Sequence, residues 1–365
     1  MRIGDLCTYA PKSQIKAGEA VDGAEYMFFT SSADESKRYS DYQFDGEGII
    51  MGTGGNATLH YYSGKYATST DCVVLLPNEQ VRCKYLYYFF KANMKVLEAG
   101  FKGAGLKHTN KKYIDNICIE HIPNYGIQDK VIRIFDEVQS VIDSRKEELL
   151  LLDDLIRARF VELFGDPIAN EKSWPTKSLE DACRIIVDCP HSTPSYTTEN
   201  TGFMCIRTSI VKKNCIMWDE IEYIPEDEYN KRIQRKKPEK GDVIYTREGA
   251  ILGIAAVIDR DYNVALGQRS MLLSPDCLQC TPEFLSTAMN CDTFLANALK
   301  GQSGSASPHI NVGDIRAFKM IMPPVEQQEY FSTFVKQVDK SKVAIQAALD
   351  KTQLLFDSLM QKYFG

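Results

Sequence analysis

The sequence lacks the features that would place the chain in a membrane or outside the cell. Its 365 residues contain no run of about eighteen apolar residues, and the opening segment, MRIGDLCTYAPKSQ, has no apolar core of the kind found in signal peptides. The eleven cysteines are an odd number, and without a secretion signal they indicate reduced thiols. The sequence therefore predicts a cytoplasmic protein without a membrane partner.

The motifs of most catalytic sites are also missing. There is no nucleophile elbow, no phosphate-binding loop and no cluster of carboxylates at metal-ligand spacing. Cys277–Cys280 has the C-x-x-C spacing of a zinc knuckle, but no second close pair of ligands accompanies it, so buried thiols are the better interpretation. The sequence predicts no catalytic residue, no metal and no cofactor.

One glycine-rich segment offers an alternative, an adenosylmethionine-dependent methyltransferase. Phe101–Gly105 fits F-x-G-x-G, a pattern of the cofactor loop in such enzymes, where glycines let backbone N–H groups approach a ligand at the end of a parallel strand. Here the preceding segment, Lys84–Leu97, has helical spacing, and no Asn/Asp-Pro-Pro-aromatic tetrapeptide is present. A cofactor site is therefore the weaker interpretation, and adenosylmethionine binding by the isolated chain would test it.

The chain has no excess of positive charge, since its formal net charge is −6. This balance argues at first against a nucleic-acid partner, but the distribution of charge matters more than its sum. One cluster contains no acid and is formed by Lys102, Lys107, His108, Lys111 and Lys112. A second cluster, Lys231–Lys240, contains an acid and is interpreted as a solvated surface segment.

Two long helices are predicted from heptad-type spacing. Apolar residues recur at alternating steps of four and three through residues 127–165, and the same pattern returns roughly 200 residues later. Such a seam needs a partner helix, so we expect the two helices to pair antiparallel within the chain. The expected partner-binding positions on the helices include Phe135, Val138, Ile142, Val335, Val338 and Leu349.

The chain is predicted to be an internal duplication. Both helices end in Phe-Gly, at Phe164-Gly165 and at Phe364-Gly365, and a polar loop with a histidine, His108 or His309, precedes each helix. A period this long lies outside the range of solenoid repeats and indicates a pseudo-dimer.

The predicted fold class is α+β, with a pseudo-twofold internal duplication. Residues 1–125 and 167–324 are expected to form two mixed α/β domains with mostly antiparallel strands, because short links outnumber crossover helices. Residues 126–166 and 325–365 are expected to form the two long, antiparallel, coiled-coil-like helices that separate these domains.

This order of parts resembles the specificity (S) subunit of Type I DNA restriction–modification systems over nearly the whole chain. The resemblance rests on Met322–Gln328 (MPPVEQQ), Leu163–Pro167 (LFGDP) and Asp188–Pro194 (DCPHSTP), followed by Ile206–Thr208. The first half lacks an Asp-Cys-Pro-His segment, which indicates a recognition domain of another subtype.

The resemblance implies a non-catalytic subunit that reads double-stranded DNA. The two globules would be target-recognition domains, each reading one half of an asymmetric, bipartite site. The helices would act as spacers, and would dock two methyltransferase (M) subunits and, through them, the motor-nuclease restriction (R) subunits. A helix of about 38 residues is about 57 Å long, which suits half-sites roughly one DNA turn apart. An alternative is the recognition subunit of a fused nuclease–methyltransferase (Type IIB-like) system, which the neighbouring gene would reveal.

DNA contacts are expected in the polar loops. Side chains with donors and acceptors read base edges, and the candidates are Asn56, Arg207, Arg247, Gln268, Arg269, Ser303 and Ser305. Cations and glycine-exposed backbone N–H groups bind phosphates, and the candidates are Lys102, Gly103, Lys107, His108, Lys111, Lys300, Gly304 and His309.

Overall fold

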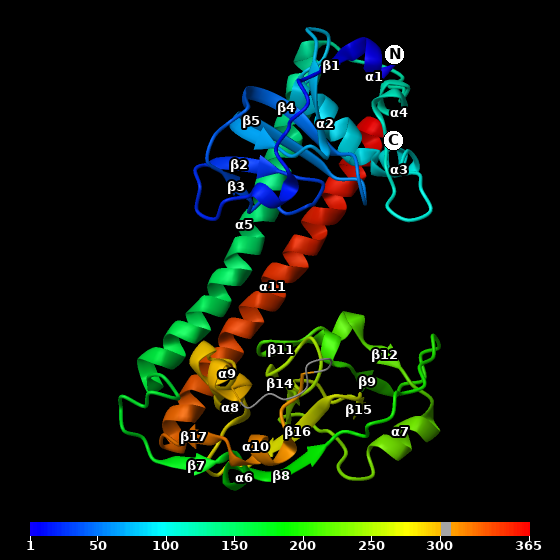
Figure 1. The fold of residues 1–365 in the computed structure, drawn as a ribbon. Coiled ribbons are helices and arrows are strands. Elements are labelled where there is room, and N and C mark those ends of the chain that lie inside the picture. Colours follow the sequence, from blue (N-terminus) through cyan, green and yellow to red (C-terminus); the bar gives the residue numbers. More distant parts are fainter. Residues whose placement is uncertain (301–307) are drawn as a thin grey trace. The chain divides into compact units, whose positions relative to one another are not determined.

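The chain divides into two compact units in a computed structural model that describes residues 1–300 and 308–365 (Figure 1). Unit 1 comprises Met1–Glu147 and Gln346–Gly365, and unit 2 comprises Glu148–Ile345. The boundary falls within both long helices, so each unit contains a part of each helix. The units therefore differ from the four predicted segments, which set the helices apart from the globules.

Unit 1 is built on a single six-stranded sheet in the order β1-β6-β4-β5-β2-β3. Its neighbouring strands are antiparallel except for β2 and β5, which are parallel. The strands are β1 (Cys7–Tyr9), β2 (Tyr26–Phe29), β3 (Arg38–Tyr39), β4 (Phe44–Gly52), β5 (Leu59–Thr68) and β6 (Cys72–Pro77). The helices are α1 (Ile3–Leu6), η1 (Ala17–Glu19), α2 (Cys83–Ala92), α3 (Met94–Ala99), α4 (Lys111–Asp115), the first part of α5 (Tyr125–Phe164) and the last part of α11 (Val325–Phe364).

Helix α2 joins this sheet to the long helices of unit 1. Its aromatic-rich sequence, CKYLYYFFKA, buries Leu86 and Phe90. On another side of α2, the Tyr88 ring lies 4.9 Å from the ring of Phe135 on α5. The Tyr88 hydroxyl also donates a hydrogen bond to Asp136 Oδ1, at 2.6 Å. Aromatic packing thus gives α2 contacts with both the sheet and α5.

Unit 2 contains several small sheets. A four-stranded antiparallel sheet has the order β14-β13-β16-β8, and a three-stranded sheet has the order β12-β9-β15, in which β9 and β15 are parallel. The strands are β7 (Thr176–Ser178), β8 (Cys183–Asp188), β9 (Met204–Ile206), β10 (Val211–Lys212), β11 (Cys215–Ile216), β12 (Glu222–Tyr223), β13 (Val243–Thr246), β14 (Ala255–Val257), β15 (Val264–Leu266), β16 (Ser270–Pro275) and β17 (Lys319–Ile321). The helices are the last part of α5, α6 (Leu179–Ala182), η2 (Thr208–Ile210), η3 (Trp218–Glu220), α7 (Glu226–Arg232), α8 (Pro282–Met289), α9 (Asp292–Leu299), α10 (Val312–Ala317) and the first part of α11.

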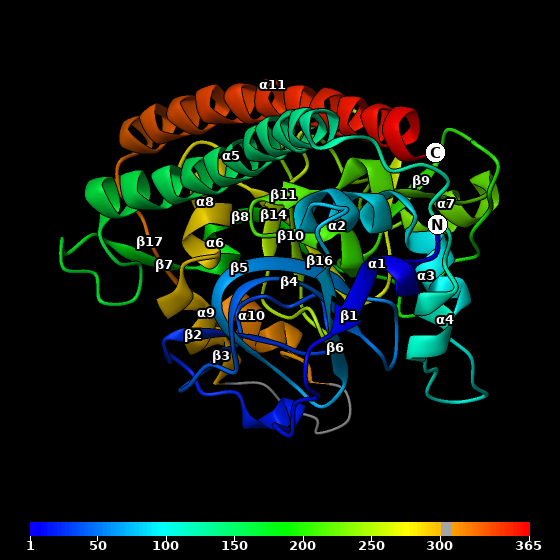
Figure 2. The same cartoon turned by 90° about the horizontal axis from the view of Figure 1, so that it is seen from above.

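Helices α5 and α11 run side by side and antiparallel, as predicted (Figure 2). In unit 1 the Phe135 ring of α5 lies 5.4 Å from the Phe356 ring of α11. In unit 2 the Phe160 ring of α5 lies 5.6 Å from the Phe331 ring of α11. The early residues of one helix thus meet the late residues of the other. Together with the mixed α/β units, this pairing confirms the predicted α+β class.

The predicted seam positions pack mainly inside the chain. Val138 is partly exposed, and the other five are buried: Phe135, Ile142, Val335, Val338 and Leu349. A buried side chain has little surface left for a second protein. Phe135 packs against Phe356 of the partner helix, and Val335 and Val338 belong to the same buried cluster as Ile156 and Phe160 of α5. A docked subunit would therefore have to contact other side chains of α5 and α11.

The duplication extends to a buried glutamine in each unit. Gln328 accepts a hydrogen bond from the Thr281 N–H at the start of α8 (3.0 Å) and donates to the Pro323 carbonyl oxygen (2.8 Å). Gln128 repeats this geometry, since it accepts from the Arg82 N–H at the start of α2 (2.7 Å) and donates to a proline carbonyl. These equivalent bonds hold α5 to the start of α2 in unit 1 and α11 to the start of α8 in unit 2.

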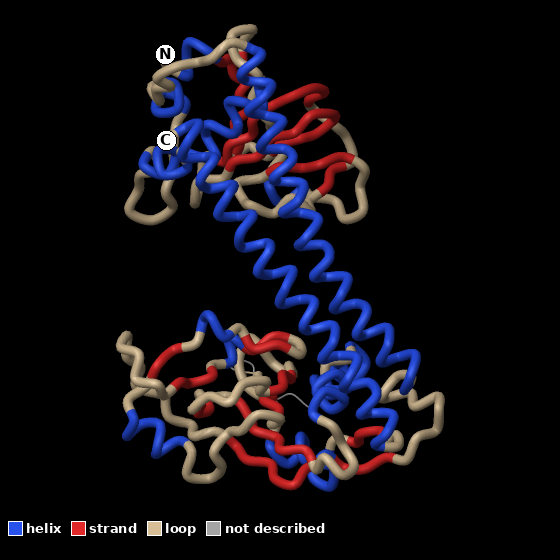
Figure 3. Tube along the Cα trace, turned by 180° about the vertical axis from the view of Figure 1, so that it is seen from behind, coloured by secondary structure: helices blue, strands red, loops and turns tan. Residues whose placement is uncertain are grey.

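Figure 3 shows both long helices as continuous helical traces, and their sequences carry charged residues along most of their length. Among the described residues, no helix is long and apolar enough to cross a membrane.

Candidate nucleic-acid interface

In unit 1, a glycine turn after strand β4 binds the loop that contains His108. The Gly55 N–H donates to the Lys107 carbonyl oxygen at 2.9 Å, and the Thr109 N–H donates to the Thr53 carbonyl oxygen at 3.0 Å. Gly54 and His108 form a backbone bridge between these two bonds. The turn has Gly55 at a φ of 82°, a conformation that residues with a Cβ rarely adopt.

Unit 2 repeats the arrangement after strand β13. The Gly249 N–H donates to the Pro308 carbonyl oxygen at 2.9 Å, and the Ile310 N–H donates to the Arg247 carbonyl oxygen at 2.9 Å. Glu248 and His309 form the matching bridge, and Gly249 also has a positive φ, 92°. The recurrence of both histidines thus reflects a duplicated backbone junction.

The predicted phosphate-binding residues of unit 1 gather at its junction. Lys102 and His108 exchange backbone hydrogen bonds of 3.0 Å in both directions, and this pairing closes the loop between them. Gly103 lies inside the loop, where an added Cβ would come within 2.7 Å of the Leu106 carbonyl oxygen. The side chains of Lys102, Lys107 and His108 are exposed. The junction therefore presents cations to solvent, together with the exposed Asn56 amide next to the turn.

A cavity of about 240 Å³ adjoins the unit 1 junction. Its lining includes Lys12, Thr53, Asn110 and Lys111. The Lys111 ammonium lies 4.4 Å from the centre of the Tyr9 ring, a contact that favours one position for this flexible cation. The sequence prediction included Lys111 but missed Lys12, which is nearly 100 residues away in the chain and joins the site only through the fold.

Unit 2 presents Gln268 and Arg269 beside its junction. They follow strand β15, and Arg269 has a φ of 75°, which is unusual for a residue other than glycine and frequent at functional sites. Arg269 is exposed and Gln268 is half-buried. The Gln268 Oε1 atom accepts a hydrogen bond from the Thr193 hydroxyl at 3.1 Å. Both side chains therefore remain candidates for contacts to bases.

Arg247 has a different environment from the one expected of a base reader. Only 6% of the residue is exposed, and its Nε and Nη2 atoms donate to the two carboxylate oxygens of Asp188, at 2.9 and 3.3 Å. This ion pair uses two guanidinium donors that a bidentate contact to guanine would need. A base contact by Arg247 would require the ion pair to open, so the structure does not present it as a reader.

The remaining candidates of unit 2 are less closely grouped. Arg207 is exposed, forms an ion pair with Glu222 and lies 5.5 Å from the Tyr196 ring centre. Lys300 is exposed and His309 is half-buried. Ser303, Gly304 and Ser305 lie outside the described residues.

The C-x-x-C segment of unit 2 separates its two thiols. Cys277 is exposed whereas Cys280 is buried, and burial raises the pKa of the Cys280 thiol well above its ordinary value. In the described part of the chain, no three side chains of His, Cys, Asp or Glu are grouped as metal ligands would be.

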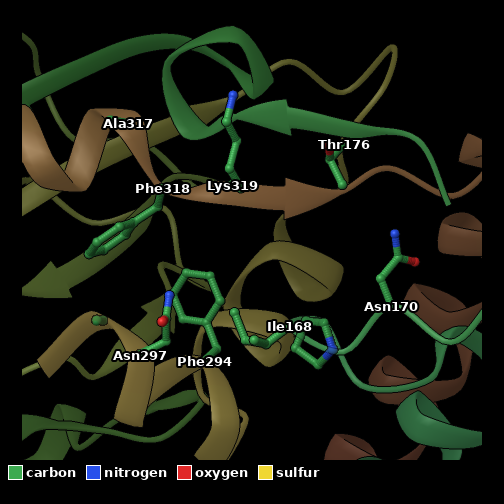
Figure 4. Close-up of a pocket in the computed structure, with 10 residues that line it drawn as sticks. Ile168, Asn170, Thr176, Phe294, Asn297, Ala317, Phe318 and Lys319 are labelled. Carbon is green, nitrogen blue, oxygen red and sulfur yellow. The ribbon is translucent and has the colours of Figure 1, made fainter. Parts of the chain in front are cut away.

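Unit 2 also contains a cavity of about 430 Å³, between the segment after α5 and helix α9 (Figure 4). Ile168, Phe294 and Phe318 line it together with Asn170, Asn297 and Lys319. None of the candidate DNA-contacting residues lines this cavity, so it is separate from the junction.

Two residues near the unit 2 junction were missed as functional candidates. His191 is exposed next to the Arg247–Asp188 ion pair, and the buried Arg232 binds the backbone one residue further on, at Ser192. The available sequence signal for this site was the Asp-Cys-Pro-His-Ser-Thr-Pro segment, but the sequence alone does not reveal which of its side chains faces outward.

Comparison with known proteins identifies the family. The family model for the Type I restriction modification DNA specificity domain matches residues 1–152 and 171–353. The MjaVIII specificity subunit of a Type I restriction enzyme from Methanocaldococcus jannaschii is 22% identical over 306 residues, which cover 80% of this chain and 72% of that protein.

Two solved structures share the fold. The S subunit of a Type I restriction–modification system from M. genitalium aligns over 100% of this chain and 95% of its own, with a TM-score of 0.63 and 14% identity. A chain from a structural study of Type I complex assembly and conformational transition aligns over 100% and 96%, with a TM-score of 0.50 and 17% identity. With the family match over both halves, the chain belongs to the Type I restriction–modification DNA specificity family.

Proposed function

We propose that the chain reads an asymmetric, bipartite DNA target, with unit 1 reading one half-site and unit 2 the other. The observation that carries this proposal is the duplicated junction, which has the same backbone hydrogen bonds but different side chains in the two units. The turn carries Thr53 in unit 1 and Arg247 in unit 2. These two side chains do not face solvent freely, but the residues beside the junction also differ, since unit 1 presents Asn56 and unit 2 presents Gln268 and Arg269. The same backbone arrangement with different exposed side chains is suited to two different DNA sequences.

Membership of the family gives the general role. The chain is a specificity subunit, which recognises DNA, assembles with other subunits of the Type I system and is not itself an enzyme. Such a subunit would act in the cytoplasm, where bacterial or archaeal DNA lies.

The two units would divide their contacts by chemistry. In unit 1, the exposed Lys102, Lys107 and His108 would bind phosphates, together with Lys111. Phosphate contacts position a protein on DNA without reading its sequence. In unit 2, Gln268 and Arg269 would read bases, because amide and guanidinium groups match the edges of adenine and guanine in the major groove. Asn56 would take this role in unit 1.

Methylation mapping tests this division. In the complex with its modification subunits, Gln268→Ala should relax one half-site by about 1–3 kcal/mol per lost bidentate contact, and the other half-site should remain as stringent as before. Lys107→Ala should weaken methylation of all targets alike. Gln327→Ala, which removes an exposed amide from α11, is the control. Equal loss of stringency in both half-sites with Gln268→Ala would refute the two-reader proposal.

Partner subunits would dock on exposed apolar positions of the long helices. Leu151 and Leu155 of α5, in unit 2, are four residues apart and 59% and 46% exposed, so they share one helix face. Leu354 and Leu355 of α11, in unit 1, are also exposed. Each unit thus offers an apolar helix surface to a methyltransferase subunit, and restriction subunits would join through it.

A further inference from the structure

The segment Asp188–Thr193 of unit 2, here called the clamped loop, is held at both ends by buried arginines. At its first residue, Arg247 forms the bidentate ion pair with Asp188, and the Arg235 guanidinium donates to the Asp188 carbonyl oxygen at 3.2 Å. Cys189, which is fully buried, accepts a hydrogen bond from the Arg269 N–H at 3.1 Å. The Arg247 and Arg269 contacts hold the start of the clamped loop against the turn after β13 and against the turn between β15 and β16.

Arg232 of helix α7 holds the other end of the clamped loop. Its Nη2 atom donates to the Ser192 carbonyl oxygen at 2.7 Å and to the Ser192 hydroxyl at 3.2 Å. Its Nε and Nη1 atoms donate to Glu228 Oε1 (2.6 Å) and to the Leu266 carbonyl oxygen (3.1 Å). The guanidinium is therefore bound on all sides although Arg232 is only 5% exposed.

Burying two guanidinium groups to hold one surface loop costs a large desolvation free energy. Desolvation of a buried ion pair offsets much of its attraction, so such pairs contribute little net stability. Their main effect here is geometric, because each planar fork accepts few arrangements of its partners. The clamped loop is thereby preorganised before any ligand arrives, which reduces the entropy cost of binding.

His191, Ser192 and Thr193 of the clamped loop are exposed. The hydroxyls of Ser192 and Thr193 are hydrogen-bonded to Arg232 and Gln268, so His191 is the stronger candidate for a ligand contact. Its side chain is 61% exposed, and its Nε2 atom lies 3.0 Å from Asp188 Oδ2. A carboxylate oxygen at this distance repels the lone pair of an unprotonated ring nitrogen, so a neutral imidazole carries its proton on Nε2. The Nδ1 atom is then an acceptor.

An outward acceptor selects its partner on DNA. Phosphate oxygens also accept hydrogen bonds and would not pair with it. In the major groove, the donors are the N6 amino group of adenine and the N4 amino group of cytosine. We propose that His191 reads one of these exocyclic amino groups in the half-site of unit 2, and that Arg247 and Arg232 are positioning residues for it. This inference rests on the proposed function, since it names a specificity-determining residue for it.

Unit 1 has no such clamp in the same place. The residue that corresponds to Arg247 in the duplicated junction is Thr53, whose hydroxyl donates to the Asp71 carbonyl oxygen at 2.9 Å. The strand equivalent to β8 is β1, because Cys7 pairs with Pro77 as Cys183 pairs with Pro275. The contribution of His191 is therefore expected in one half-site only.

Removal of single amino groups from DNA tests the inference in the assembled complex with its modification subunits. Methylation mapping first defines the target. Duplexes are then made with purine in place of each adenine, or pyrimidin-2-one in place of each cytosine, apart from the methylated base. One of these duplexes should bind the wild-type complex about three- to tenfold more weakly. His191→Ala should bind the native duplex more weakly by a similar factor and should no longer distinguish the two duplexes.

Two further variants separate positioning from folding. Arg247→Lys keeps the charge but loses the fork, and should reduce discrimination at the same base pair without changing the other half-site. His121→Ala, an exposed histidine of unit 1, should leave all affinities unchanged. Because His191 lies on the surface, its variant is informative even if Arg247→Lys proves unstable.

The outcomes distinguish the inference from the proposed function. If His191→Ala retains full discrimination while Gln268→Ala relaxes a half-site, the inference is overturned and the two-reader proposal stands. If His191→Ala weakens every sequence equally, the contact is to phosphate and the inference is again overturned. If no variant of unit 2 changes a half-site, the proposed function itself fails.

Discussion

At the scale of single residues, the buried glutamines show how one polar side chain joins distant segments. Gln328 accepts from the Thr281 N–H and donates to the carbonyl oxygens of Gln279 and Pro323. Gln328 is fully buried, and loss of its amide removes the partner of these three backbone groups. An unpaired buried polar group costs more than the net gain from the bond it replaces.

Gln328→Ala should therefore lower the free energy of unfolding by about 2–4 kcal/mol. The neighbouring Gln327→Ala, at an exposed position of α11, should change it by about 0.5 kcal/mol or less. Urea unfolding followed by circular dichroism measures both. Equal stability of the two variants would show that the Gln328 amide is dispensable.

At the scale of elements, the helix pair combines an apolar seam with a few polar positions. Arg145 of α5 donates to the Thr352 hydroxyl of α11 in unit 1. Lys342 of α11 binds Asp153 of α5 in unit 2, at 2.5 Å. Polar groups in a seam favour the one register that pairs them. The apolar positions then supply most of the stability, and their contribution depends on burial.

Burial predicts different effects for two equivalent substitutions in the seam. Val338 is 6% exposed, and Val338→Asp should cost about 3–5 kcal/mol, because it buries an unpaired carboxylate. Val138 is partly exposed, so Val138→Asp should cost about half as much. Val343→Asp, on a 70% exposed position of α11, is the matched control and should be nearly neutral. Thermal unfolding of the three variants checks this order, and equal melting temperatures would contradict the paired seam.

At the scale of the whole molecule, charge limits what the chain can do alone. The net charge of −6 leaves little counterion release to drive sequence-independent binding to DNA. We therefore expect weak binding by the chain alone and tight binding in the complex, where partner subunits add their own contacts.

Titration of a labelled duplex at fixed salt, with and without the modification subunits, measures this gain in affinity. Leu151→Asp combined with Leu155→Asp should reduce the gain, because it places charges on one of the two exposed faces proposed for docking, but it should leave the weak binding by the chain alone unchanged. Lys351→Asp, at an exposed charged position of α11, tests whether added negative charge by itself is responsible. Equal affinity of the wild-type chain with and without partners would contradict the expectation.

The sequence by itself determined the long helices, their pairing, the duplication and the family. These features follow from local periodicity and from segments that recur along the chain. Both can be recognised without knowing which residues are in contact in the folded protein. The polar loops containing His108 and His309 were found in this way. The hydrogen bonds of Gln128 and Gln328 could not be found in this way.

Only the tertiary structure decided the roles of Arg247, Arg232 and His191. Arg247 meets Asp188 across 59 residues of sequence, and Arg232 meets Ser192 across 40. An arginine in a polar loop has the composition of a DNA-reading residue whether its guanidinium faces solvent or a buried carboxylate. That difference depends on the packing of segments distant in sequence, and the same packing leaves the His191 side chain exposed on the clamped loop.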